Sequence, residues 1–256
     1  MALLEVKNLS ISFGGLKAVD NFQISIEKGQ LYGLIGPNGA GKTTIFNLLT
    51  GVYKPDAGSI ELAGVNITGR KTTEINQAGI ARTFQNIRLF KDLSVLDNVM
   101  FPLNMFSNDT LRERTKRAMF CLERVNLTEA KDKFPGEISG GMQKRVAIAR
   151  AISLNPQYLF CDEPNSGLDP KTSLVIDDLI HDITQEYNMT TIINTHDMNS
   201  VLGIGEKVIY IYEGHKEWEG TKDDIFTSTN ERLNNFIFAS DLLRKVKDLE
   251  VQSMEG

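Results

Sequence analysis

Residues Gly36-Pro37-Asn38-Gly39-Ala40-Gly41-Lys42-Thr43-Thr44 form the most informative stretch of this chain. They match the pattern G-x-x-x-x-G-K-[ST], which is typical of a loop that binds the phosphate chain of a nucleotide. Residues 30–35 before the stretch are a short apolar run that predicts a buried strand, and residues 43–49 after it predict the start of a helix. An ordinary glycine-rich turn is the alternative, but this order of strand, loop and helix favours a phosphate-binding loop.

The residue types in this stretch suit phosphate binding. Glycines let main-chain N–H groups turn toward phosphates without a clash from a Cβ atom, and the N-terminus of the following helix adds partial positive charge. Lys42 supplies a full positive charge for the β- and γ-phosphates, and the hydroxyl of Thr43 is a ligand for Mg²⁺. We therefore expect the nucleotide to contact Gly36, Pro37, Asn38, Gly39, Ala40, Gly41, Lys42, Thr43 and Thr44.

A second element of a phosphate site lies at residues 158–163, where an apolar run ends in Asp162 and Glu163. Asp162 is placed to hold Mg²⁺, directly or through water. Glu163 is placed as the general base, or as the group that orients the attacking water. A strand that ends in a solvated acidic turn is the alternative, and an isolated motif would favour it. The phosphate-binding loop earlier in the chain makes it the poorer interpretation.

Three single polar residues complete the predicted site. Gln85 is placed to reach Mg²⁺ and the attacking water, and His196, after a second apolar run, is placed to contact the γ-phosphate. Asp169 closely follows Glu163 and precedes a proline. Each has a plainer interpretation when taken alone: a surface glutamine, a histidine at the end of a strand and an aspartate in a turn.

Residues 138–142 are the element that discriminates best between functions. Ser139 is able to cap the N-terminus of a helix, and Gly140 and Gly141 bare the main-chain N–H groups beside it. A plain helix cap is one interpretation. The other is a second phosphate-binding surface, used on a nucleotide that another subunit holds.

The composition is that of a globular protein. The 256 residues are 41% hydrophobic and 24% charged, enough for one large domain or a domain with a subdomain. No stretch approaches the roughly 18 consecutive apolar residues of a membrane span, and Glu5 and Lys7 interrupt the first apolar residues, which argues against a signal peptide. The net charge of −5 argues against a nucleic-acid partner. Two cysteines, Cys121 and Cys161, are too few for a disulfide scaffold, so we expect a cytosolic protein.

The order of predicted elements is that of an α/β fold. Alternating apolar and polar residues predict antiparallel strands between residues 3 and 31. Short apolar runs at 159–161 and 191–194 predict buried strands of a parallel sheet. Helical spacing or helix-start signals predict helices at 96–134, 139–152 and 174–187. Since strand and helix recur, we predict a parallel α/β core with a helical insertion near 86–150.

Taken together and in this order, these motifs resemble those of ABC transporter ATPase subunits, over nearly the whole chain. The resemblance implies one ABC ATPase domain, 1–256, with a RecA-like P-loop NTPase core and an antiparallel β subdomain. That core would comprise residues 1–85 and 155–230. A helical ABC subdomain with the signature motif would occupy 86–154, and a C-terminal helical extension would occupy 231–256.

The same resemblance implies an ATPase that uses ATP and Mg²⁺, and it gives roles to single residues. Phe13 corresponds to the aromatic residue that stacks on adenine. The metal would be held by Thr43, Gln85 and Asp162. The catalytic residues would be Glu163, His196 and Gln85. The ATP of a facing copy would contact Ser139 and Gly141. Gly140 and Asp169 would also belong to the nucleotide-binding residues. One departure is Met142, which stands where the usual signature LSGGQ has its glutamine.

The resemblance divides near residues 90–97. Residues 1 to about 95, above all 12–19 and 79–90, resemble the ATPases of branched-chain amino-acid importers. Residues from about 97 onward resemble the ATPase of Mla-type phospholipid transporters, in which a methionine at position 142 is normal. We therefore predict a phospholipid (Mla-type) transporter ATPase, with a branched-chain amino-acid importer ATPase as the alternative. A chimeric or engineered ABC ATPase domain with no native transport partner is a further alternative.

The family resemblance also implies partners and a location. Two copies would face head to tail as a homodimer with ATP at the interface, so that ATP closes the dimer and hydrolysis opens it. Integral membrane permease subunits would dock in a groove between the core and the helical subdomain. The chain would then be cytoplasmic and peripheral on the inner (plasma) membrane. A soluble ABC ATPase of DNA repair or translation is less favoured, because those chains usually carry long coiled coils or two cassettes.

An amphipathic pattern runs through residues 231–250 and predicts a helix. Its apolar residues are Leu233, Phe236, Ile237, Leu242, Leu243, Val246 and Leu249. We expect this helix to pack against its own domain, and a contact with the partner cassette is the alternative.

Overall fold

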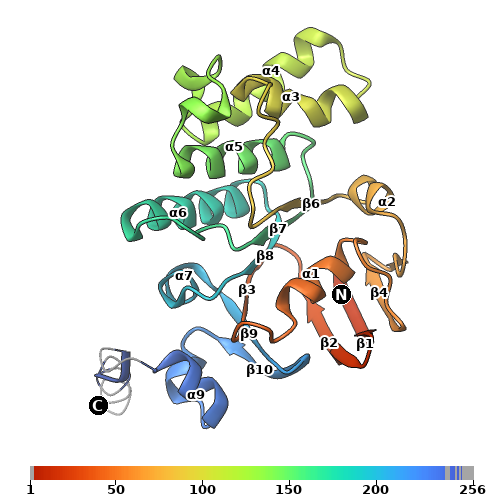
Figure 1. Cartoon of the computed structure of the whole chain (residues 1–256), viewed down its shortest axis with the longest axis vertical. Coiled ribbons are helices and arrows are strands. Elements are labelled where there is room, and N and C mark those ends of the chain that lie inside the picture. The colour runs from red at the N-terminus through yellow and green to blue at the C-terminus, as the bar shows by residue number, and fades with distance from the viewer. Residues whose placement is uncertain (1–2, 240–242, 246, 248, 250–256) are drawn as a thin grey trace.

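A computed structural model describes residues 3–239, 243–245, 247 and 249, and a six-stranded sheet lies at its centre (Figure 1). The strand order is β10-β9-β3-β8-β7-β6; the strands from β9 to β6 run parallel, and β10 is antiparallel to β9. These strands are β3 (Leu31–Ile35), β6 (Ile80–Thr83), β7 (Tyr158–Asp162), β8 (Thr190–Asn194), β9 (Lys207–Tyr212) and β10 (His215–Thr221). The predicted parallel α/β core is confirmed.

The central strands are buried because both faces of this sheet are covered. Side chains alternate across a strand, so successive residues of β7 enter different apolar clusters: Leu159 lies in one and Phe160 in the other. The cluster around Phe160 contains α1 (Lys42–Leu49), and the cluster around Leu159 contains α5 (Gly140–Ile152) and α6 (Pro170–Glu186). Apolar runs without alternation are typical of strands that are covered on both sides.

A second, antiparallel sheet lies beside α1 and shares its apolar cluster. Its strand order is β2-β1-β4-β5. The strands are β1 (Leu4–Phe13), β2 (Leu16–Ile26), β4 (Ala57–Leu62) and β5 (Val65–Asn66). The tight turn between β1 and β2 brings Phe13 and Leu16 beside the phosphate-binding loop. The prediction of antiparallel strands between residues 3 and 31 is confirmed.

The helical part forms one end of the molecule, at the top of Figure 1. It consists of α3 (Val95–Phe106) and α4 (Leu111–Arg124), which pack on α5, and it follows the short helix α2 (Thr72–Gln77) and strand β6. Ser94 caps α3 by accepting from the N–H of Asp97, and Thr110 caps α4 in the same way. These caps and the turn at 128–130 divide the predicted helical region 96–134 into separate helices, and a second turn at 135–137 follows that region.

The described C-terminal part packs against β9 and β10. Its helices are α7 (Met198–Ile204), α8 (Asp224–Thr227) and α9 (Glu231–Ile237). Leu233 and Ile237 are buried in the same apolar cluster as β9, as expected for packing against the chain's own domain. The prediction of one continuous helix over 231–250 is wrong, because Phe238 leaves helical geometry and its ring packs against Phe226 of α8. Two residues of the predicted pattern lie outside the described part: Leu242 and Val246.

Candidate nucleotide-binding site

The phosphate-binding loop connects β3 to α1, as predicted. Gly41 precedes α1 with a φ of 101°, a left-handed conformation that favours glycine. A Cβ atom at Gly41 would lie 2.7 Å from the carbonyl oxygen of Ala18 in β2, so the loop needs glycine there for space as well. No side chain caps the first turn of α1, which leaves its N–H groups for a ligand.

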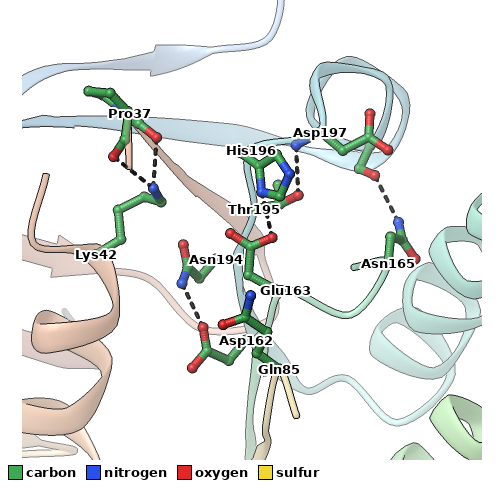
Figure 2. A network of polar contacts seen from close by, with 12 residues as sticks. Pro37, Lys42, Gln85, Asp162, Glu163, Asn165, Asn194, Thr195, His196 and Asp197 are labelled. Carbon is green, nitrogen blue, oxygen red and sulfur yellow. Dashed lines mark hydrogen bonds and ion pairs between the residues drawn. The ribbon is translucent and has the colours of Figure 1, made fainter. Parts of the chain in front are cut away.

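Lys42 is the first residue of α1 and is almost completely buried. Its Nζ donates hydrogen bonds to the main-chain oxygens of Gly36 (2.7 Å) and Pro37 (3.1 Å) (Figure 2). Burial lowers the pKa of Lys42, and the carboxylates of Glu163 and Asp162 act in the opposite direction. A buried ammonium whose hydrogen bonds go to neutral carbonyls is stabilised by an anion in front of it, as a nucleotide phosphate would be.

A cavity of about 510 Å³ lies in front of this loop. It unites predicted residues from four parts of the chain: Phe13, residues 38–44, Gln85 and Glu163. Phe13 is 44% exposed, and its ring meets Tyr53 edge to face at 5.2 Å. A partly exposed aromatic ring at the rim of a phosphate cavity is suited to stack on a base.

Asp162 is the last residue of β7 and is buried. Its Oδ2 accepts from Nη2 of Arg82 at 2.6 Å, and its Oδ1 accepts from Nδ2 of Asn194 at 2.6 Å. Asn194 is the residue of β8 that pairs with Asp162, which explains why the two side chains meet. A carboxylate offers about four lone-pair sites, so two of them remain for Mg²⁺ or its water. Asp162 therefore fits the predicted metal role.

Glu163 follows Asp162 with a φ of 50°, and its main-chain N–H donates to the oxygen of Asn194 (2.8 Å). This left-handed turn places the Glu163 side chain in the cavity, where its Oε2 lies 2.6 Å from Nδ1 of His196 (Figure 2). The imidazole is 56% exposed, whereas the Glu163 carboxylate is 9% exposed. The structure thus brings together the predicted general base and the histidine predicted to contact the γ-phosphate.

Gln85 is exposed and lines the same cavity from the segment after β6. Its main-chain oxygen accepts from Nζ of Lys144 (2.9 Å), which also donates to the main-chain oxygen of Glu163 (3.2 Å). Lys144 belongs to α5 and is buried, and this burial lowers its pKa. One side chain of the helical part therefore holds two segments of the site.

The remaining predicted residues lie at other helix N-termini. Ser139 caps α5 by accepting from the N–H of Met142 (3.3 Å), with Gly140 exposed beside it and Gly141 packed on α6. Asp169 caps α6 by accepting from Thr172, whose side-chain and main-chain hydrogen bonds lower the pKa of Asp169. Within the described part of the chain, these residues do not line the cavity.

Three site residues were missed by the reasoning from sequence: Arg82, Lys144 and Asn194. An arginine inside the short apolar run 80–83 was a signal for Arg82. Asn194 at the end of a buried strand was a similar signal, because polar side chains there meet the ends of neighbouring parallel strands. No local pattern indicated the contacts of Lys144.

These features define a class of protein: a P-loop ATPase whose site is built at the carboxyl ends of parallel strands. The model of the ABC transporter family matches residues 19–166, and the chain belongs to that family. It is 38% identical over 237 residues to the high-affinity branched-chain amino acid transport ATP-binding protein BraF of Pseudomonas aeruginosa, covering 87% of this chain and 93% of that protein. It is 36% identical, over the same shares, to the corresponding protein LivG of Escherichia coli.

Solved structures lead to the same family. CbiO1 of Clostridium perfringens, part of the ABC transporter complex cbiONQ, is 29% identical with a TM-score of 0.82, covering 97% of this chain and 98% of that one. A dimeric ATP-binding cassette bound to ADP and Pi is 31% identical with a TM-score of 0.77, covering 86% and 98%. The chain accordingly has the RecA-like ABC ATPase fold, and it binds ATP with Mg²⁺ and hydrolyses ATP.

The comparisons do not support the predicted division of the chain near residues 90–97. The match to BraF covers 87% of the chain and thus extends far beyond residue 95. Neither the Mla-type prediction nor a chimeric origin gains support.

None of the helices formed by the described residues has the length and apolar character that spanning a bilayer requires.

Proposed function

We propose that this chain is the ATPase subunit of an ABC importer for branched-chain amino acids. The cavity that joins Phe13, the phosphate-binding loop, Gln85 and Glu163 carries the ATPase part of the proposal. The names of the relatives support the cargo, since two of them serve branched-chain amino acid transport. A methionine import ATP-binding protein is also 36% identical over 92% of the chain, which supports import more generally.

Each site residue has a distinct part in this proposal. When bound, ATP supplies the phosphoanhydride bond to be broken, and Mg²⁺ neutralises the phosphate charge. The ammonium of Lys42 would bind the β- and γ-phosphate oxygens, and Thr43, Gln85 and Asp162 would hold the metal. The carboxylate of Glu163 accepts the proton of the attacking water, and the contact with His196 keeps that carboxylate oriented.

The remaining predicted residues act between two copies of the chain. Ser139, Gly140, Gly141 and Asp169 lie at helix N-termini away from the chain's own cavity. Exposed helix N-termini attract phosphate, so a facing copy would present its nucleotide to them. We infer a head-to-tail homodimer that permease subunits anchor at the cytoplasmic face of the inner membrane.

A transport assay with the chain and its membrane subunits tests which molecule is transported. Membrane proteins that copurify with the tagged chain would be reconstituted in vesicles, and ATP-dependent uptake of leucine would be measured. Uptake that stops in the Glu163→Gln variant supports the proposal. Movement of phospholipid without leucine uptake would instead favour the Mla-type function that residues from about 97 onward suggested.

A separate measurement tests the site. Glu163→Gln should retain ATP binding and accumulate an ATP-dependent dimer in size-exclusion chromatography, because the dimer closes but the water is no longer activated. An unimpaired turnover rate in this variant would remove Glu163 from the proposed role.

A further inference from the structure

Arg82 connects the metal carboxylate to the helix that follows the phosphate-binding loop. Its side chain is only 7% exposed. Nη2 donates to Oδ2 of Asp162 at 2.6 Å, and Nη1 donates to the side chains of Asn47 (2.7 Å) and Thr50 (2.9 Å) at the end of α1. One guanidinium therefore contacts two of the elements that build the site, α1 and β7, from a third, β6.

The sheet register explains why Arg82 reaches Asp162. In the parallel pair β6–β7, Arg82 is opposite Phe160, and Asp162 lies two residues further along β7. Residues two apart on a strand share a face, so Arg82, Phe160 and Asp162 all face α1, where Phe46 packs on Phe160 at 5.4 Å. The register of β6 with β7, and not a surface ion pair, therefore fixes Arg82 on that face of the sheet.

Two aromatic rings restrict the guanidinium further. Its central carbon lies 4.8 Å from the ring centre of Phe84 and 5.7 Å from that of Phe46. A planar cation over aromatic rings, with forked donors to a carboxylate, is a role that lysine reproduces only in part. Because Asn194 holds the other oxygen of Asp162, the carboxylate has a single orientation.

Arg82 also lines a second cavity, of about 370 Å³, beside the edge strand β6. Phe84, Arg88 and Phe90 line the same cavity. Arg88 lies over Phe84 at 5.5 Å, as Arg82 does, but within the part of the chain that the structure describes its side chain forms no hydrogen bond or ion pair with a site residue. Arg88 is therefore a control arginine that shares one ring, Phe84, with Arg82 and is exposed.

We propose that Arg82 is a positioning residue that orients the Asp162 carboxylate for Mg²⁺. The inference rests on the metal role proposed for Asp162. It predicts that Arg82 affects the metal requirement of the site and leaves the binding of metal-free ATP unchanged, because Lys42 and the loop bind the phosphates without it.

The test compares Arg82→Met, Arg82→Lys and Arg88→Met in the full chain. Binding of a fluorescent ATP analogue would be measured in EDTA and over a range of Mg²⁺ concentrations, together with ATP turnover. For Arg82→Met we expect unchanged binding in EDTA and a rise of about 10-fold or more in the Mg²⁺ concentration for half-maximal turnover, the size typical when a residue behind a metal ligand is lost. Arg82→Lys should restore part of this shift, and Arg88→Met should match the parent.

A double-mutant cycle with Asp162→Asn separates positioning from a merely structural role. If Arg82 acts through Asp162, then replacing Arg82 changes the Mg²⁺ dependence in the parent and not in the Asp162→Asn background. An unchanged Mg²⁺ dependence in Arg82→Met or Arg82→Lys, or additive effects in the cycle, would overturn the proposal. If Arg82→Met does not fold, Arg82→Lys completes the same cycle. An Asp162→Asn variant with the parent's Mg²⁺ dependence would refute the proposed metal role itself, which is a distinguishable result.

Discussion

Replacing Gly141 by alanine is expected to destabilise the packing of α5 on α6. Gly141 is buried in the first turn of α5, and an added Cβ would lie 2.6 Å from Cγ2 of Thr172. Thr172 does not rotate away without loss, because its Oγ1 donates to Oδ2 of Asp169 at 2.5 Å. The alanine therefore forces either a backbone shift or the loss of this side-chain hydrogen bond.

The expected change in the free energy of unfolding follows from two opposing effects. Overpacking of this kind costs roughly 1–3 kcal/mol, whereas alanine in place of glycine in a helix returns at most about 1 kcal/mol. We expect the free energy of unfolding to fall by about 1–2 kcal/mol, measured by denaturant titration with an unchanged slope. A variant as stable as the parent would refute this steric argument.

Thr172→Ser is the matched control, since it removes Cγ2 and keeps the hydroxyl that binds Asp169. In that background Gly141→Ala should be neutral or stabilising, and an equal loss in both backgrounds would also refute the argument. The double variant, combined with Glu163→Gln, then tests the proposed dimer. A stable protein that no longer dimerises with ATP would show that Gly141 is needed at the partner's nucleotide and not only for packing.

Three further outcomes are expected. Lys144→Met should lower the free energy of unfolding by about 1–3 kcal/mol, because two site carbonyls lose a charged donor, and should slow turnover; a turnover rate equal to the parent's would contradict the link. Lys42→Ala should lose nucleotide affinity in a binding titration, and retained affinity would undermine the loop assignment. Burial raises the pKa of Cys121 to about 11 and of Cys161 to about 12, so both stay thiols at pH 8. Mass spectrometry should therefore find iodoacetamide adducts only after denaturation, and rapid labelling of the folded protein would disprove this burial.

The parts of the site that depend only on residues close together in the chain could be predicted from the sequence. The run from Gly36 to Thr44 needs only its own strand and helix to form a phosphate loop, and Asp162 and Glu163 need only the end of one strand. Arg82 was not predictable in this way, because its partner Asp162 lies 80 residues away and the contact depends on the pairing of β6 with β7.

The predicted length of the last helix was wrong for a related reason. The apolar pattern over 231–250 continues past Ile237, but periodicity alone does not show where a helix ends. Phe238 leaves the helix where its ring finds a tertiary contact with Phe226. The same limit applies to the division near residues 90–97, since short strings of residues resembled two families while the match to one relative covers 87% of the chain.

The charges at the site explain how an acidic chain binds a polyanion. The whole chain carries a net charge of −5, which argues against nucleic acid as a partner. Among the described residues, the nearly buried charges that meet at the site are the cations Lys42, Arg82 and Lys144 and the carboxylates Asp162 and Glu163. The cations thus outnumber the carboxylates by one before any ligand binds, and Lys42 is the cation whose hydrogen bonds go only to carbonyls of the loop.

Such an arrangement separates affinity for phosphate from the charge of the surface. Salt screens exposed charges over a length of about 10 Å at 0.1 M, and buried groups much less. The exposed acidic residues therefore oppose the approach of ATP only weakly at physiological salt. Once the nucleotide lies on the loop, the field of Lys42 acts through a medium of low polarity and is correspondingly stronger. The net charge of this chain consequently describes its exposed surface, which repels polyanions weakly. The buried cations determine that the cavity binds a phosphate chain.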